Sequence, residues 1–141
     1  MLNGELARGV ARWALAAFMG FAGVGHLVAT DSFLGQVPPW LPYRTSIVVV
    51  SGVVELGFSL ALVLLPDRRR QVGWALAAFF VLVFPGNLYQ AMAGTDAFGL
   101  DTPAARWARL IAQPVLVLWA LWSTGAWPRH DRTSPPEARG T

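Results

Sequence analysis

Residues 45–65, TSIVVVSGVVELGFSLALVLL, decide the fold of this chain. This apolar run holds a single charged side chain, Glu55. A helix rises about 1.5 Å per residue, so about 20 apolar residues cross the roughly 30 Å hydrocarbon core of a bilayer. Residues 45–65 therefore predict a transmembrane helix.

Three further apolar runs have a similar length, at residues 9–29, 71–93 and 104–126. The run 71–93 contains no charged residue, whereas 104–126 includes two arginines, Arg106 and Arg109, near its beginning. The run 9–29 has no convincing cleavage site after it, which favours an anchored helix over a signal peptide. The turn 66–70 is so short that its flanking helices must be antiparallel neighbours. We therefore expect an all-α integral membrane four-helix bundle over residues 1–127.

The arginines predict the orientation of this bundle. Eight of the eleven basic residues fall on the side of the two termini and the 66–70 turn, and three fall on the other side. Cytoplasmic segments carry the excess of positive charge, so both termini are expected in the cytoplasm. The proline-rich, polar tail 128–141 is expected to be a disordered cytoplasmic segment.

Composition excludes several classes of function. The chain is 55% hydrophobic and 13% charged, and its net charge is +3. A soluble nucleic-acid binder needs a polar, basic surface, so the expected partner is the lipid bilayer and not nucleic acid. Cysteine is absent, so the chain itself is not expected to carry out thiol chemistry. The expected spans contain one His and one Glu, His26 and Glu55, and such a pair is a poor ligand set, so no metal site is expected.

Five polar side chains lie at membrane depth in the outer half of the expected bundle: His26, Glu55, Asn87, Arg109 and Gln113. Such groups need a partner or a water-filled cavity, so they predict either a structural network or a ligand- or proton-handling site. Glu55 is expected to pair with Arg109, since an unpaired carboxylate there would cost several kcal/mol or take up a proton. The supporting residues are Ser51 beside Glu55, Pro85 as a helix kink, and Trp40 in a proline-rich loop that is either a connector or a lid.

Small residues in the first two spans predict close helix contacts. These positions are Ala16, Gly20, Gly23, Gly52 and Gly57.

The pattern resembles the DoxX-like family of small bacterial four-helix membrane proteins. The matching segments are Gly23-Val24-Gly25-His26, Pro38-Pro39-Trp40-Leu41-Pro42, Ser51 to Leu56, Pro66 with its arginines, Phe84 to Tyr89, and Arg109-Leu110 with Gln113. Proline often follows Arg-Leu in that family, whereas this chain has Ile111. The resemblance implies a multi-pass protein of the bacterial inner membrane.

The same resemblance implies a redox-associated membrane subunit, linked to quinone or to sulfur and thiol stress, that is not an enzyme on its own. Quinone is then the candidate cofactor, and other membrane or peripheral redox subunits, or further copies of the chain, are candidate partners. Two alternatives stay open: a carrier of protons or a small solute, and a structural or assembly subunit without its own ligand. A midplane Glu near Arg and His fits the carrier as well.

Overall fold

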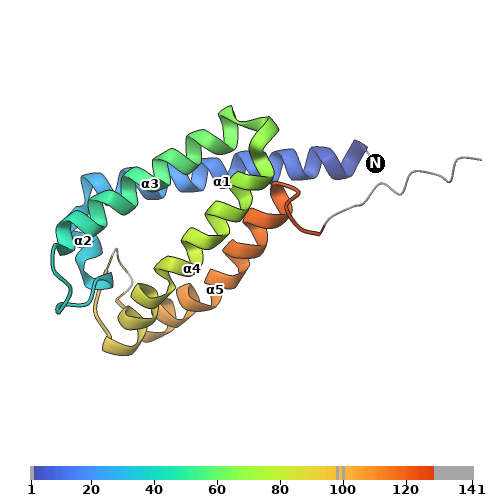
Figure 1. The fold of residues 1–141 in the computed structure, drawn as a ribbon. Helices are drawn as coiled ribbons and strands as arrows, with labels where there is room; N and C mark the ends of the chain where they lie inside the picture. Colours follow the sequence, from blue (N-terminus) through green and yellow to red (C-terminus); the bar gives the residue numbers. More distant parts are fainter. Residues whose placement is uncertain (1, 98, 100, 129–141) are drawn as a thin grey trace, which may run out of the picture.

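The computed structural model describes residues 2–97, 99 and 101–128, and this part of the chain is all-helical (Figure 1). The α-helices are α1 (Leu2–Val28), α2 (Thr30–Phe33), α3 (Arg44–Leu64), α4 (Arg69–Ala93) and α5 (Pro103–Ser123). Two short 3-10 turns, η1 (Leu34–Gln36) and η2 (Pro66–Arg68), lie before α3 and α4. The expected disordered tail lies outside the described residues, apart from Pro128.

Three of these helices are long and apolar enough to cross a membrane: α1, α3, and α4 taken with its preceding turn. The fourth long helix, α5, has 21 residues and carries Arg106, Arg109 and Gln113. The long helices begin and end close to the predicted spans, except that α1 already begins at Leu2. The segment before residue 9 consists mostly of good helix formers, which extend α1 beyond its apolar run.

The long helices form two antiparallel pairs, in which α1 packs along α3 and α4 packs along α5 (Figure 1). The pairs meet near the turn between α3 and α4, where Leu15, Met19, Leu62 and Leu76 form the largest core cluster. They diverge toward the end that carries α2 (Figure 1). A site between the two pairs is therefore open at the α2 end.

Glycines bring α1 and α3 together, as predicted, at Gly23 and Gly52. A Cβ at Gly52 would lie 2.8 Å from the Cβ of His26 and 3.0 Å from the Gly23 carbonyl oxygen. Gly57 does not share this role, because a Cβ there would meet nothing within 4 Å. Gly57 lies elsewhere on the helix circumference, so the expectation of a close contact there is wrong.

Pro85 does not interrupt α4, which continues as a helix from Arg69 to Ala93. Proline has no N–H to donate to the preceding turn, so its neighbourhood needs other hydrogen-bond partners. The carbonyl that Pro85 leaves without an intrahelical donor is that of Val81. One residue earlier, Gln113 Nε2 of α5 donates to the Phe80 carbonyl at 2.7 Å. This bond ties α5 to α4 close to the proline.

Candidate functional site

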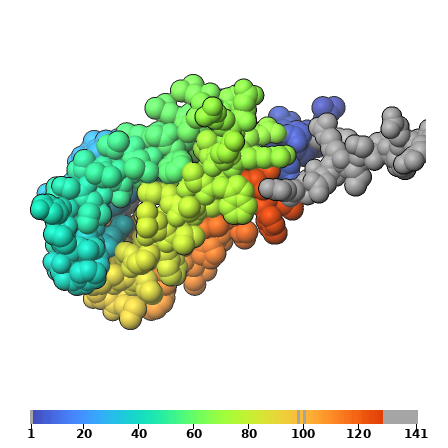
Figure 2. Space-filling view, in the orientation of Figure 1, coloured from blue at the N-terminus to red at the C-terminus, as the bar shows by residue number. Residues whose placement is uncertain are grey.

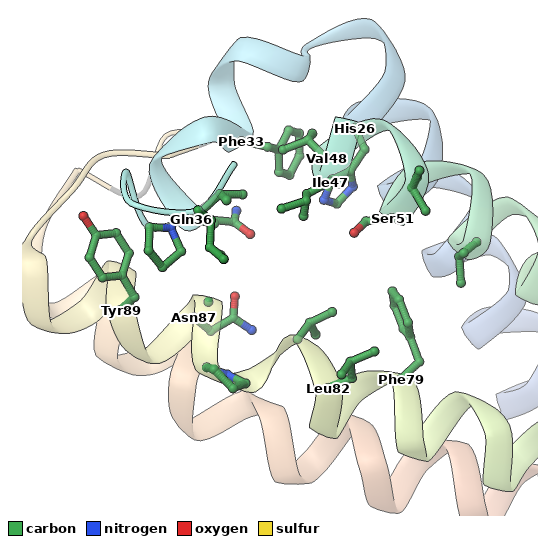
Figure 3. Close-up of a pocket in the computed structure, with 18 of the residues that line it drawn as sticks. His26, Phe33, Gln36, Ile47, Val48, Ser51, Phe79, Leu82, Asn87 and Tyr89 are labelled. Carbon is green, nitrogen blue, oxygen red and sulfur yellow. The ribbon is translucent and has the colours of Figure 1, made fainter. Parts of the chain in front are cut away.

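A cavity of about 620 Å³ lies between the two helix pairs at the α2 end. The space-filling view shows the surface hollowed between α3 and α4 (Figure 2). In the close-up, Asn87, Leu82 and Phe79 on α4 face His26, Gln36 and Ser51 across this space (Figure 3). Most of the walls are apolar, and the polar side chains that line the cavity are His26, Gln36, Ser51, Glu55, Asn87, Tyr89, Arg109 and Trp40.

The structure brings seven of the eight sequence-predicted site residues to this one cavity. They are His26, Glu55, Asn87, Arg109, Ser51, Pro85 and Trp40. The eighth, Gln113, is buried behind the wall, where it accepts a hydrogen bond from Asn87 Nδ2 at 2.9 Å. Gln113 therefore supports a wall residue and does not face the cavity.

His26 and Glu55 form a buried pair between α1 and α3. His26 Nδ1 lies 2.9 Å from Glu55 Oε2 and 2.8 Å from the Ala22 carbonyl oxygen. A carboxylate oxygen and a carbonyl oxygen both accept, so Nδ1 carries the proton when Glu55 is ionised. The Nδ1 proton is shared between two acceptors, and Glu55 Oε2 is left without a well-aligned hydrogen bond.

Phe33 of α2 fixes the orientation of the His26 ring. The two rings stack with their centroids 3.9 Å apart and their planes 24° apart. Thr30 adds a second tie, because its hydroxyl donates to the His26 carbonyl at 2.8 Å. The imidazole is thus held by the segment that follows its own helix.

The expected direct ion pair between Glu55 and Arg109 is not formed. Arg109 Nη2 donates instead to Gln36 Oε1 at 3.0 Å, and no ion pair within 4.0 Å joins Arg109 to Glu55. Glu55 pairs with His26 because α1 is the helix packed most closely on α3, whereas Arg109 belongs to the other helix pair. The guanidinium still lies in the electrostatic field of the Glu55 carboxylate.

Arg106 belongs to a different contact from Arg109, although the two share one side of α5. Its guanidinium is buried, binds the Asp96 carboxylate and donates to the Asp101 carbonyl at 3.0 Å. Arg106 thus fixes the connection between α4 and α5. Within the described residues, no three His, Cys, Asp or Glu side chains are grouped as metal ligands would be.

A family model matches residues 15–124, and its description is "Domain of unknown function (DUF8561)". The chain belongs to the DUF8561 family. The matched segment includes every residue that lines the cavity of this DUF8561 domain. No curated protein and no solved structure matches the chain.

Sequence reasoning missed Gln36, which faces the cavity of the DUF8561 domain from η1. Its Oε1 accepts from Arg109, while its Nε2 is buried and has no hydrogen-bond partner in the part of the chain that the structure describes. The segment fits against α4 because Gly86 has no side chain: a Cβ there would lie 3.0 Å from the Gln36 carbonyl oxygen. An amide in an otherwise apolar stretch next to Pro38 and Pro39 was the available signal.

Proposed function

We propose that this protein is a redox-associated membrane subunit that binds the head of a quinone, or of a similar amphipathic molecule, in the cavity between α3 and α4. The main support for this proposal is a cavity with apolar walls and a small set of polar groups that come from several helices. Its volume of about 620 Å³ falls within the roughly 300–1,000 Å³ of typical ligand sites. The resemblance to the DoxX-like family supports the same class of ligand.

The polar groups supply the hydrogen bonds that a quinone head needs. Within the described residues, Gln36 Nε2 is a buried donor without a partner. Glu55 Oε2, 2.9 Å from His26 Nδ1, has no well-aligned hydrogen bond and can accept another. A quinone carbonyl accepts from the first, and the hydroxyl of the reduced quinol donates to the second. His26 and Glu55 are placed to exchange the protons that accompany reduction, and the electrons would come from a partner redox subunit.

The rim of the cavity suits a ligand that arrives from the bilayer. Val50, Val54 and Leu82 line the cavity and are also exposed on the outside of α3 and α4. Exposed apolar side chains at membrane depth face lipid, so an apolar tail would extend between these helices into the bilayer. A water-soluble ligand has no apolar tail that would gain from contact with these exposed apolar side chains.

The proposal includes four spans in the bacterial inner membrane, with both termini in the cytoplasm. The 21-residue length of α5 supports the fourth span, since about 20 residues are needed. Its arginines also pair inside the protein, Arg106 with Asp96 and Arg109 with Gln36, and so do not have to face lipid. The arginine bias between the two sides supports the orientation.

Binding of a short-chain benzoquinone tests the function. The chain is placed in nanodiscs, and the Kd is measured from quenching of tryptophan fluorescence. We expect Gln36→Leu to weaken binding about tenfold, since a lost hydrogen bond costs about 1 kcal/mol or somewhat more.

Gln90→Leu is the matched control. Among the described residues, Gln90 Nε2 is likewise buried without a partner, but Gln90 does not line the cavity. This variant should therefore bind quinone as the original chain does. Equal Kd values for both variants, or no quenching of the original chain, would contradict the proposal.

A further inference from the structure

A second, smaller cleft of about 80 Å³ lies at the opposite end of the molecule and shares no residue with the quinone cavity. It forms where the first part of α1, the start of α4 and the end of α5 meet (Figure 1). Arg8, Arg12, Arg69 and Glu5 line it together with Ser123 and Thr124. The cleft exceeds the roughly 30 Å³ of one water in the liquid, so it has room for a small polyatomic anion.

The charges of this cleft are unbalanced. Three arginines face one glutamate, which leaves two positive charges in excess. Glu5 lies 3.9 Å from Arg8 and 4.0 Å from Arg69, at the limit of an ion pair, and its side chain is 66% exposed. Exposed pairs of this kind contribute little, so Glu5 does not neutralise the arginines.

Arg12 supplies the observation that points to a ligand. Its Nε is buried and has no hydrogen-bond partner within the described residues. A buried guanidinium N–H is costly to leave unpaired, more so than a neutral donor. The hydroxyls of Ser123 and Thr124 already donate to the Ala120 carbonyl, at 3.5 and 2.7 Å. The donors left for an anion are therefore the guanidiniums.

We propose that this cleft binds a phosphate group, supplied by the head of an anionic phospholipid in the adjacent leaflet. A guanidinium matches phosphate oxygens with parallel N–H donors, and the bond is charge-assisted. Basic pockets between membrane helices on the arginine-rich side are the places where anionic lipid heads bind. The site is independent of the quinone cavity and of the redox role.

Lipid retention by the full chain tests the site. The protein is extracted from bilayers of phosphatidylcholine and phosphatidylglycerol, and native mass spectrometry counts the bound lipid. Arg12→Gln and Arg69→Gln should each reduce retained phosphatidylglycerol about fivefold or more, as loss of a charge-assisted bond predicts. Arg70→Gln removes the same charge nearby but outside the cleft, and should leave retention unchanged.

A second arm separates the lipid from soluble phosphate. Inorganic phosphate is added to the protein in pure phosphatidylcholine nanodiscs, and the melting temperature is followed. An Arg12-dependent rise there, with no preference for phosphatidylglycerol, would overturn the lipid assignment. Equal losses in Arg12→Gln, Arg69→Gln and Arg70→Gln would overturn the site itself. Arg69 is partly exposed, so Arg69→Gln keeps the test valid if Arg12→Gln fails to fold.

Discussion

At the scale of single residues, Glu55 pairs with His26 and Arg109 with Gln36, although all four side chains line the same cavity. Ionisable groups at membrane depth need partners, and this rule selected His26, Glu55 and Arg109, which all line one cavity. The partner of each depends on which helices pack most closely. The close contact between α1 and α3 is set by glycines on the facing sides of the two helices. Which glycines face the partner helix depends on the angle at which the helices cross, and the sequence does not give that angle.

The pairing of Glu55 can be measured with two double-mutant cycles. We expect a coupling free energy of about 1 kcal/mol between Glu55→Gln and His26→Ala, in the range found for polar contacts in membrane bundles. The coupling between Glu55→Gln and Arg109→Gln should be smaller, because no direct bond joins those side chains. Unfolding in mixed micelles gives the free energies. A larger coupling with Arg109 than with His26 would contradict the observed geometry.

At the scale of elements, the helices were predictable to within a few residues, apart from the start of α1. Length and apolarity define a membrane helix, and Pro66 and Pro103 mark the positions where α4, with its preceding turn, and α5 begin. The segment between α1 and α3 was harder, because α2 and η1 are too short to leave a periodic pattern. The structure shows that η1 packs closely on α4 at Gly86, where a Cβ would lie 3.0 Å from the Gln36 carbonyl oxygen.

The contact between α1 and α3 gives a prediction at this scale. Gly52→Ala should lower the free energy of unfolding by about 1–3 kcal/mol, because the new methyl group would press on His26 and on the Gly23 carbonyl. Gly57→Ala should leave stability unchanged or raise it by up to about 1 kcal/mol, through helix propensity alone. Melting temperatures in detergent compare the two variants. Similar losses at both positions would argue against the glycine contact.

At the scale of the whole molecule, sequence predicted four long helices and the short connection between the second and the third. It did not predict that the two helix pairs diverge toward α2 and enclose a cavity (Figure 1). Divergence depends on how bulky side chains such as Phe33, which is buried against His26, fill the space between helices. Hydropathy carries no information on that.

The proposed four-span topology has a direct test, because the chain contains no cysteine. Single cysteines replace Ser32, Asp67, Asp101 and Thr133, and right-side-out vesicles are treated with an impermeant maleimide. Ser32→Cys and Asp101→Cys should react, whereas Asp67→Cys and Thr133→Cys should be protected until the vesicles are opened. Labelling of both Asp101→Cys and Thr133→Cys in intact vesicles would mean that α5 does not cross the membrane, and the inverse of the expected pattern would mean that the termini lie outside.

The most direct test of the central claim is to block the rim of the cavity and count the bound quinone. Leu82 lines the cavity and is 76% exposed on α4, while Val115 on α5 is 60% exposed and lies outside it. Leu82→Trp and Val115→Trp therefore place the same bulky side chain at two exposed positions, one at the rim of the cavity and one away from it. Quinone is extracted from each purified protein after incorporation into quinone-containing bilayers. We predict that Leu82→Trp loses most of the bound quinone and Val115→Trp retains it; equal quinone content in both variants would contradict binding between α3 and α4.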